Sequence, residues 1–468
     1  MKILDYVKFA IIVFGATAPV VAQSEGMDFF QKGNYLKAID AFETQLLSSK
    51  NFNEGLYFYL GDANSELGAL CRQLYEASCH FGSQYYEKLA ANNPRNPLFA
   101  YFYGLYLLGA GEKDKARQAF QKAAGTKQSP YGDYAQIWLN VLNGSGQKVR
   151  QSHLQLELAV ASLESGKNSA TGSDLIKLLD YHQLDSKHAQ YNYLILLIST
   201  GDLSRPAALL KDDFDYRLMV TSEKVAEPGS DQTIAYLCYH PLILKYLSRY
   251  YYLKSLDYFL ELEKKLTNPE HRKIVAQKIG MAYVAVDHPG AAAYLAETND
   301  PFLSNFWALN YWKNGNHSSA AGIWSKNLTE KDPQVSGYAG YFAAKYAGDK
   351  RQGLEACARA NETRFIELKR KRYDPRLTLL LAEIYLHQKD MIKAAVTMDQ
   401  CNQFDNSNDP IFLLQYGEIL YQNGETRYND ALDALYKLQA SNVLARQVHY
   451  IIQGLIAREA PPIGPQKL

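Results

Sequence analysis

The sequence predicts an all-α solenoid built from antiparallel helix pairs, and three observations support this fold class. A pattern of small and aromatic residues at fixed offsets returns along the 468 residues. Hydrophobic residues make up 47% of the chain, which is typical of a folded protein. In residues 146–275, where the pattern fades, no run of alternating β-branched residues suggests a sheet. Because one helix pair is too small to bury its own apolar face, the pairs must stack to form a core.

The repeated pattern has a small residue, an Ala 12 residues later and a large side chain 16 residues later. The matching sets are Gly26, Ala38 and Phe42; Gly104, Ala116 and Phe120; Ala308, Ala320 and Trp324; and Ala382, Ala394 and Met398. Small residues let two helices cross closely, and the large side chain fills the gap to neighbouring helices. A glycine such as Gly111 or Gly315, seven residues after the first small residue, favours a left-handed helix end.

This pattern resembles the tetratricopeptide repeat, whose usual unit has about 34 residues in two antiparallel helices. Candidate repeats start near Gly26, Gly61, Gly104, Gly280, Ala308, Tyr341, Ala382 and Gly417. The long step from Gly61 to Gly104 is interpreted as an insertion around Cys71 and Cys79, with the second helix of that repeat near Tyr86. The resemblance implies a protein that binds an extended peptide or a partner helix in a concave groove lined by the first helices.

Five segments follow from this pattern. The prediction is a signal peptide at 1–22, a first array at 23–145, degenerate helical repeats at 146–275, a second array at 276–457 and an extended tail at 458–468. Within the degenerate region, four residues fit the second helix of a repeat. They are Tyr252, Ser255, Phe259 and Leu262.

The N-terminal segment predicts export. Phe9 to Val21 is apolar, and small residues precede Gln23, as at a cleavage site. The apolar stretch is shorter than the roughly 20 residues that cross a bilayer. We therefore expect an exported chain, periplasmic or secreted, that starts near Gln23 and has no transmembrane span; an uncleaved anchor is the alternative.

The charge balance argues against nucleic-acid binding. Fifty basic and 49 acidic side chains leave a net charge of +1, without the cationic surplus that neutralises phosphates. The histidines are scattered, and His182 and His188 lack the spacing of a zinc site. The sequence therefore predicts no catalytic residue, no cofactor and no metal site.

Two local features leave alternatives open. Cys71 and Cys79 form either a disulfide, which an oxidising compartment permits, or two small apolar contacts in helix packing. A basic cluster near the C-terminal repeats is either a solvated face or a docking patch for an acidic partner or an anionic envelope polymer. Its members are Arg364, Lys369, Arg370, Lys371, Arg372 and Arg376.

The function expected from these observations is that of a non-enzymatic, exported scaffold that binds partner proteins. By analogy with exported proteins that carry such repeats, we place it in a bacterial cell-envelope assembly for polymer export, secretion or a surface appendage. A luminal co-chaperone of a eukaryotic secretory pathway is the alternative. An enzyme with its site in residues 146–275 is a third hypothesis, which no residue pattern recommends.

Overall fold

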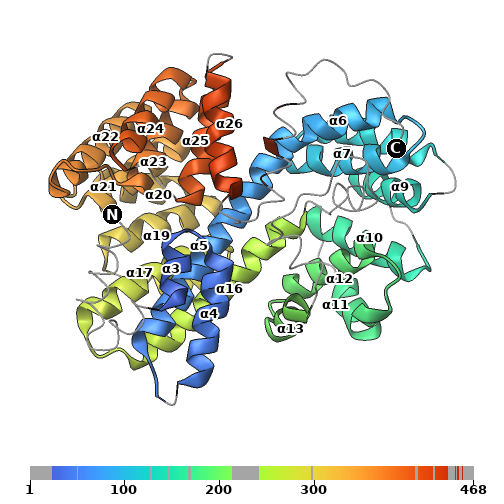
Figure 1. Cartoon of the computed structure of the whole chain (residues 1–468), viewed down its shortest axis with the longest axis horizontal. Coiled ribbons are helices and arrows are strands. Elements are labelled where there is room, and N and C mark those ends of the chain that lie inside the picture. Colours follow the sequence, from blue (N-terminus) through green and yellow to red (C-terminus); the bar gives the residue numbers. More distant parts are fainter. Residues whose placement is uncertain are drawn as a thin grey trace. The chain divides into compact units, whose positions relative to one another are not determined.

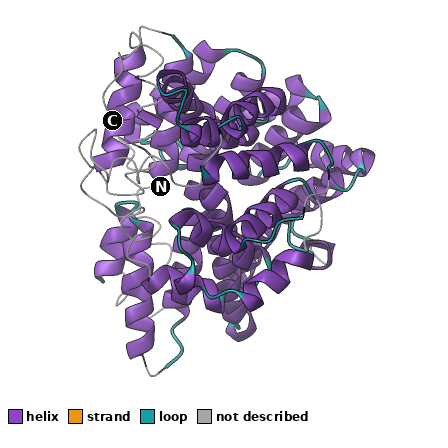
Figure 2. Cartoon of the chain, turned by 90° about the vertical axis from the view of Figure 1, so that its right-hand side faces the viewer, coloured by secondary structure: helices purple, strands orange, loops and turns teal. Residues whose placement is uncertain are grey.

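The computed structural model confirms an all-helical fold (Figure 2). It describes residues 24–49, 51–126, 129–145, 148–166, 170–212, 242–296, 299–405, 409–424 and 427–440, and positions 448, 451, 452 and 456. Within these ranges the chain forms helices and connecting turns and no strand. None of these helices combines the length and the apolar character needed to cross a membrane. The predicted signal peptide and tail lie outside the described residues.

The chain forms two compact units. Unit 1 comprises Met1–Leu67 and Tyr251–Val443, and unit 2 comprises Gly68–Tyr250 and Leu444–Leu468. The boundaries fall within α5 (Glu54–Ala77) and α16 (Leu242–Lys265). These units cut across the predicted segments 23–145, 146–275 and 276–457, whose boundaries stay predictions.

Unit 1 is a series of helix pairs (Figure 1). Besides parts of α5 and α16, its helices are α3 (Glu25–Gln31), α4 (Tyr35–Ser48), α17 (Pro269–Ala285), α18 (Ala291–Ala296), α19 (Pro301–Lys313), α20 (His317–Asn327), α21 (Pro333–Phe342), α22 (Lys350–Glu367), α23 (Pro375–His387), α24 (Met391–Asp405), α25 (Pro410–Gln422) and α26 (Tyr428–Ala440). Consecutive helices pair as α3 with α4, α17 with α18, and so on to α25 with α26.

The first helices of the later pairs share one starting signal, which is Asp or Asn followed by Pro. At α19 the Asp300 carboxylate accepts hydrogen bonds from the backbone N–H groups of Phe302 at 2.7 Å and Leu303 at 3.4 Å. Proline at the first helical position has no N–H to leave unpaired, and its φ already suits the helix. The same signal starts α17, α21, α23 and α25. Local sequence therefore sets where these helices begin.

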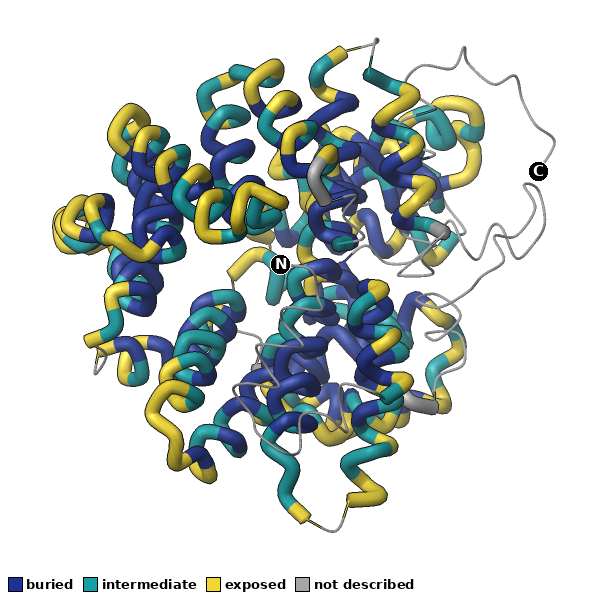
Figure 3. The backbone as a smooth tube through the Cα atoms, turned by 60° about the vertical axis from the view of Figure 1, so that its left-hand side comes forward, coloured by how far each residue is buried: buried dark blue, intermediate teal, exposed yellow. Residues whose placement is uncertain are grey.

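The small residues of the repeated pattern lie where the helices of a pair cross. A Cβ atom on Gly26 would lie 2.6 Å from the Phe42 ring, and one on Gly104 would lie 2.5 Å from the Phe120 ring. The alanines of the pattern have no exposed surface, and buried segments concentrate where helices face each other (Figure 3). These alanines are Ala38, Ala116, Ala308, Ala320, Ala382 and Ala394.

Left-handed residues end the first helices, as expected from the glycine at offset seven. Gly111 has φ 81° and Gly315 has φ 84°. Two non-glycine residues take the same role, because Asp287 has φ 50° and Lys389 has φ 62°. Trp324, at offset 16 from Ala308, is fully buried and donates its indole N–H to the Asn305 carbonyl at 3.1 Å.

The second pair of unit 1 is split in sequence. A Cβ atom on Gly61 would lie 2.6 Å from the ring of Phe259 in α16, as Gly26 meets Phe42 in the first pair. Phe58 also contacts Phe259, with ring centroids 6.1 Å apart. The partner of this α5 segment is thus the part of α16 in unit 1. The interpretation that placed its second helix near Tyr86 is corrected, because α6, which contains Tyr86, belongs to unit 2.

The repeat that was expected to start at Tyr341 starts at Gly340. A Cβ on Gly340 would lie 2.5 Å from the Gly353 carbonyl oxygen, so the two backbones cross there. A π-helical turn, Ala343–Ala347, follows α21. This turn adds one residue between the two crossing positions, which shifts the pattern by one residue relative to the other pairs.

Unit 2 is helical as well. Besides parts of α5 and α16, it contains the π-helical turn η2 (Ser78–Gly82), α6 (Ser83–Asn92), α7 (Pro97–Gly109), α8 (Lys113–Ala124), α9 (Pro130–Leu142), α10 (Ser152–Glu164), α11 (Ala170–Leu178), the short 3₁₀ turn η3 (Tyr181–Gln183), α12 (Lys187–Ser199) and α13 (Ser204–Asp212). Helices α6 to α10 pack in sequence, and α12 returns against α10. The described part of residues 146–275 is therefore helical, as the periodicity predicted.

Candidate functional site

The first helices of unit 1 form its inner layer. Direct contacts join α17 to α19, α19 to α21, α21 to α23 and α23 to α25. Successive second helices in the described part of unit 1 share no comparable contacts. Because the first helices lie closer together, the array curves toward them. We call the side formed by α17, α19, α21, α23 and α25 the inner face.

Polar side chains at two offsets from the small residue line this face. Tyr341 and Glu383 follow their small residues by one position, and Lys345 and His387 by five. Positions four apart share one side of a helix. The Tyr341 hydroxyl donates to the Glu383 carboxylate, Lys345 lies 3.6 Å from the same carboxylate, and Gln415 donates to it at 3.3 Å. The polar row therefore links α21, α23 and α25.

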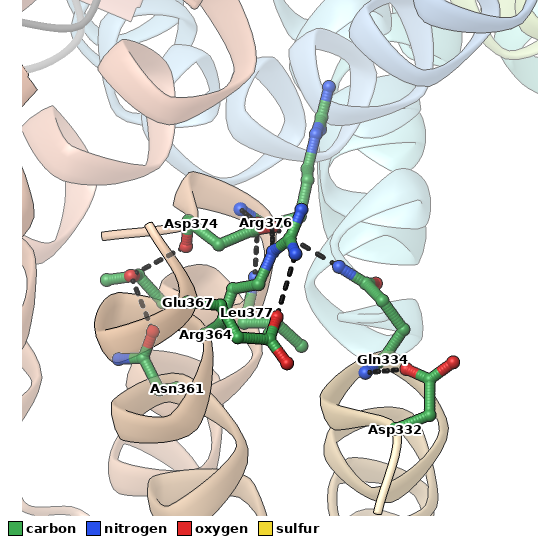
Figure 4. Close-up of polar contacts among 9 residues, drawn as sticks. Asp332, Gln334, Asn361, Arg364, Glu367, Asp374, Arg376 and Leu377 are labelled. Atoms are coloured by element: carbon green, nitrogen blue, oxygen red, sulfur yellow. Dashed lines mark hydrogen bonds and ion pairs between the residues drawn. The ribbon is translucent and has the colours of Figure 1, made fainter. Parts of the chain in front are cut away.

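A second polar cluster surrounds Arg376 at the start of α23 (Figure 4). Its guanidinium forms an ion pair with Glu66 of α5 and lies 3.5 Å from Asp409, the cap of α25. Asp374 caps α23, accepts a hydrogen bond from Gln334 at 3.2 Å and lies 3.6 Å from Arg364. One turn before Glu66, Asp62 forms an ion pair with Lys278 of α17. These contacts connect the second pair with the third, sixth and seventh pairs.

Burial changes the titration of this cluster. It raises the pKa of the Glu66 carboxyl; Asp62 and Asp409 add to the increase, whereas Arg376 and Lys278 oppose it. Burial likewise raises the pKa of Tyr338 to about 12. The ionised Glu66 is therefore held less favourably here than in water, in spite of its ion pair with Arg376.

The structure divides the predicted basic cluster. Arg364 forms an ion pair with Glu367 at 2.9 Å and lies near Asp374. Arg372 is buried, and Arg376 lies on the inner face, where it pairs with Glu66. Lys369, Arg370 and Lys371 remain exposed at the turn after α22. Two of them adopt the left-handed region, with φ 58° for Lys369 and 53° for Arg370. Three of the six residues thus have structural partners, and three form an exposed basic turn.

Unit 2 contains a buried carboxylate that sequence analysis missed. Glu157 of α10 has no exposed surface. It accepts hydrogen bonds from the Tyr101 hydroxyl and the Trp138 indole at 2.5 Å, and from Asn192 at 2.7 Å. His188 Nε2 also lies 2.7 Å from it. The burial of Tyr101 and the adjacent carboxylate raise the pKa of its hydroxyl.

This network joins α7, α9, α10 and α12. Four polar partners around one carboxylate offset the cost of removing it from water. Because the group is enclosed, its arrangement serves packing rather than access by a substrate. The available sequence signal is a charged residue in the apolar run Leu154–Leu163, where neighbours such as Leu156 and Val160 are fully buried.

The structure supports helix packing rather than a disulfide for Cys71 and Cys79. Cys71 and Cys79 are free and buried. They are eight residues apart along the helical segment formed by α5 and η2, so their Cα atoms are about 12 Å apart, whereas a disulfide needs about 7 Å or less. A Cβ on Gly109 of α7 would lie 2.2 Å from the Cys79 sulfur, which shows how closely α7 packs there. No group of three or more His, Cys, Asp or Glu in the described ranges could hold a metal.

Residues 82–133 match the tetratricopeptide repeat family. They extend from the end of η2 into α9, so the match lies in unit 2. The predicted resemblance to the tetratricopeptide repeat is therefore confirmed for residues 82–133. No curated protein matches the chain in sequence.

The solved structures similar to the chain include the following three. The APC/C hetero-tetramer Cut9–Hcn1 matches at 13% identity and TM-score 0.30, over 93% of this chain and 96% of the other. The complex of Naa15/Naa10 with HypK-THB matches at 16% and 0.21, over 90% and 68%. Human IFIT1, a dimer with m7Gppp-AAAA, matches at 14% and 0.23, over 86% and 93%. At these TM-scores the likeness says nothing about what this chain binds.

Proposed function

We propose that this chain is an exported scaffold that works by binding partner proteins rather than by catalysis, within a bacterial cell-envelope assembly. The observation that carries the proposal is the inner face of unit 1, where helix pairs present a polar row from α21, α23 and α25. Stacked repeats of this kind provide an extended binding surface for a peptide or a helix. Export is supported by the N-terminal segment alone, because Phe9 to Val21 reads as a signal sequence.

Crosslinking in the native cell, followed by capture and mass spectrometry, tests the binding surface. His387 and Gln422 are exposed inner-face positions five residues after their small residues, so His387→Glu and Gln422→Lys should reduce capture of the partner set. The matched controls are Lys326→Glu and Arg351→Glu, at exposed positions of the second helices α20 and α22, and they should leave capture unchanged. Equal capture by all four variants would contradict a binding site on the inner face.

Cell fractionation and N-terminal sequencing test the export proposal separately. We expect a mature chain that begins near Gln23, with envelope or secretion components among its partners. A chain that retains Met1 together with cytosolic partners would contradict export and leave the scaffold proposal intact.

The exposed basic turn is a second contact for an anionic partner in this proposal. Lys369 and Arg370, which precede the exposed Lys371, have a backbone in the left-handed region, which costs such residues about 1 kcal/mol or more each. Replacing Lys369 and Arg370 with Gly should relieve that cost and remove two charges. We expect lower affinity for oligoglutamate, with a loss of the salt dependence of binding, and unchanged or higher thermal stability. Unchanged affinity would exclude the turn as an anion contact.

A further inference from the structure

The contacts around Arg376 connect helix pairs that are not neighbours in the array. Glu66 lies in the second pair of unit 1, Arg376 in the sixth and Asp409 at the start of the seventh. Arg376 and Glu66 are 310 positions apart in sequence. In a stacked array each pair normally contacts only its neighbours. This ion pair is therefore an addition to the stacking that builds the array.

The chemistry of this contact differs from that of the stacking. Pairs three to six are joined by an apolar core from Val284 to Ile384, which includes no side chain of α5. The contact of Arg376 with Glu66 and Asp409 is ionic, and the side chains of Arg376 and Glu66 are 33% and 23% exposed. Separating apolar surfaces in water is costly, whereas separated charges regain their hydration. The ionic contact is thus the one that can open while the stacking stays intact.

We propose that Arg376, Glu66 and Asp409 form a clasp that closes the inner face of unit 1, and that its release opens this face to a partner chain. The clasp joins the second helix pair to the sixth and seventh pairs of the same array. It deepens the proposed function by stating when the inner face is accessible, but its closure does not depend on that function. The raised pKa of Glu66 indicates that burial disfavours its ionised carboxylate while the clasp is closed. Opening the clasp lets this carboxylate regain its hydration, which offsets part of the lost attraction to Arg376.

The experiment measures a distance within unit 1 by pulsed electron paramagnetic resonance. Spin labels are attached to cysteines at Leu47, which is 84% exposed in α4, and at Lys371, which is exposed before α23. Cys71, Cys79, Cys357 and Cys401 are buried, and Cys238, outside the described residues, is replaced by Ser. Arg376→Gln should shift the distance distribution to longer values and broaden it, and Glu66→Gln should do the same.

A matched control separates opening from general loss of an ion pair. Arg427 forms a two-point ion pair with Asp399, both contacts at 2.9 Å, between residues only 28 positions apart. Arg427→Gln should leave the distance distribution unchanged. In the labelled chain without these substitutions, raising the salt to about 1 M should shift the distribution in the same direction by less than Arg376→Gln does, because salt screens a partly buried pair only in part. An unchanged distribution in Arg376→Gln and in high salt would overturn the clasp, even if partner binding to the inner face is established.

Discussion

Replacing Gly61 by Val tests the split second pair of unit 1. A Cβ at this position would lie 2.6 Å from Cε1 and 2.7 Å from Cδ1 of Phe259, whose side chain has no exposed surface. Valine and glycine have similarly modest helix propensities, so the effect on the helix itself is small. Forcing extra methyl groups into this packed crossing should lower the free energy of unfolding by about 1–3 kcal/mol.

Combining Gly61→Val with Phe259→Ala tests whether the two residues are in contact. Phe259→Ala alone should cost about 3–5 kcal/mol, because it removes a fully buried ring and leaves a cavity. If Gly61 and Phe259 are partners, the valine of the double variant occupies space that the ring has left. The double variant should then lose about 3–5 kcal/mol instead of the additive sum of about 4–8 kcal/mol.

Urea unfolding followed by far-ultraviolet circular dichroism measures these free energies. Gly104→Val with Phe259→Ala is the control, because a Cβ on Gly104 would meet Phe120 instead, and its effects should add. Additive effects of Gly61→Val and Phe259→Ala, within about 0.5 kcal/mol, would refute the reasoning that joins residues 54–67 to α16.

Three further outcomes are expected. Ala116→Trp and Ala320→Trp should each overpack a helix crossing and lower stability by about 1–3 kcal/mol or more, which thermal melting measures; melting like the wild type would show that the repeat register is wrong. Glu157→Ala should cost about 3–5 kcal/mol in urea unfolding, because it strands several buried polar partners; a loss below 1 kcal/mol would contradict that network. Burial raises the pKa of Cys79 to about 12 and also raises that of Cys71, so both thiols should resist alkylation at pH 8 until urea is added. Peptide mass spectrometry measures the labelling, and rapid labelling of the native chain would contradict the burial of these thiols.

Local patterns in the sequence determined the helix pairs. The offsets from Gly104 to Ala116 and Phe120 lie within 17 residues, and the corresponding contact in the structure joins consecutive helices. Caps such as Asp300 act on backbone groups two or three residues away. Because these interactions are local, a single sequence contains all the information that they need. The all-helical class and the tetratricopeptide resemblance were predictable for this reason.

The register of one pair shows the limit of that reasoning. A π-helical turn after α21 moves the crossing from Tyr341 to Gly340, since one additional residue enters the helix. The fixed offsets of the other pairs contain no signal for such a turn. The basic cluster has a similar limit, because Arg376 and Lys371 are both cations in the sequence, but one pairs with Glu66 and the other is exposed.

The tertiary structure alone decided which distant segments meet. Gly61 packs against Phe259, almost 200 residues away in sequence, and Arg376 forms an ion pair with Glu66. Glu157 accepts hydrogen bonds from side chains of three other helices. Helical periodicity specifies which side of a helix is apolar but not which other helix will cover it. The sequence by itself therefore established the repeated helix pair, whereas the split pair, the clasp and the buried carboxylate depend on long-range packing.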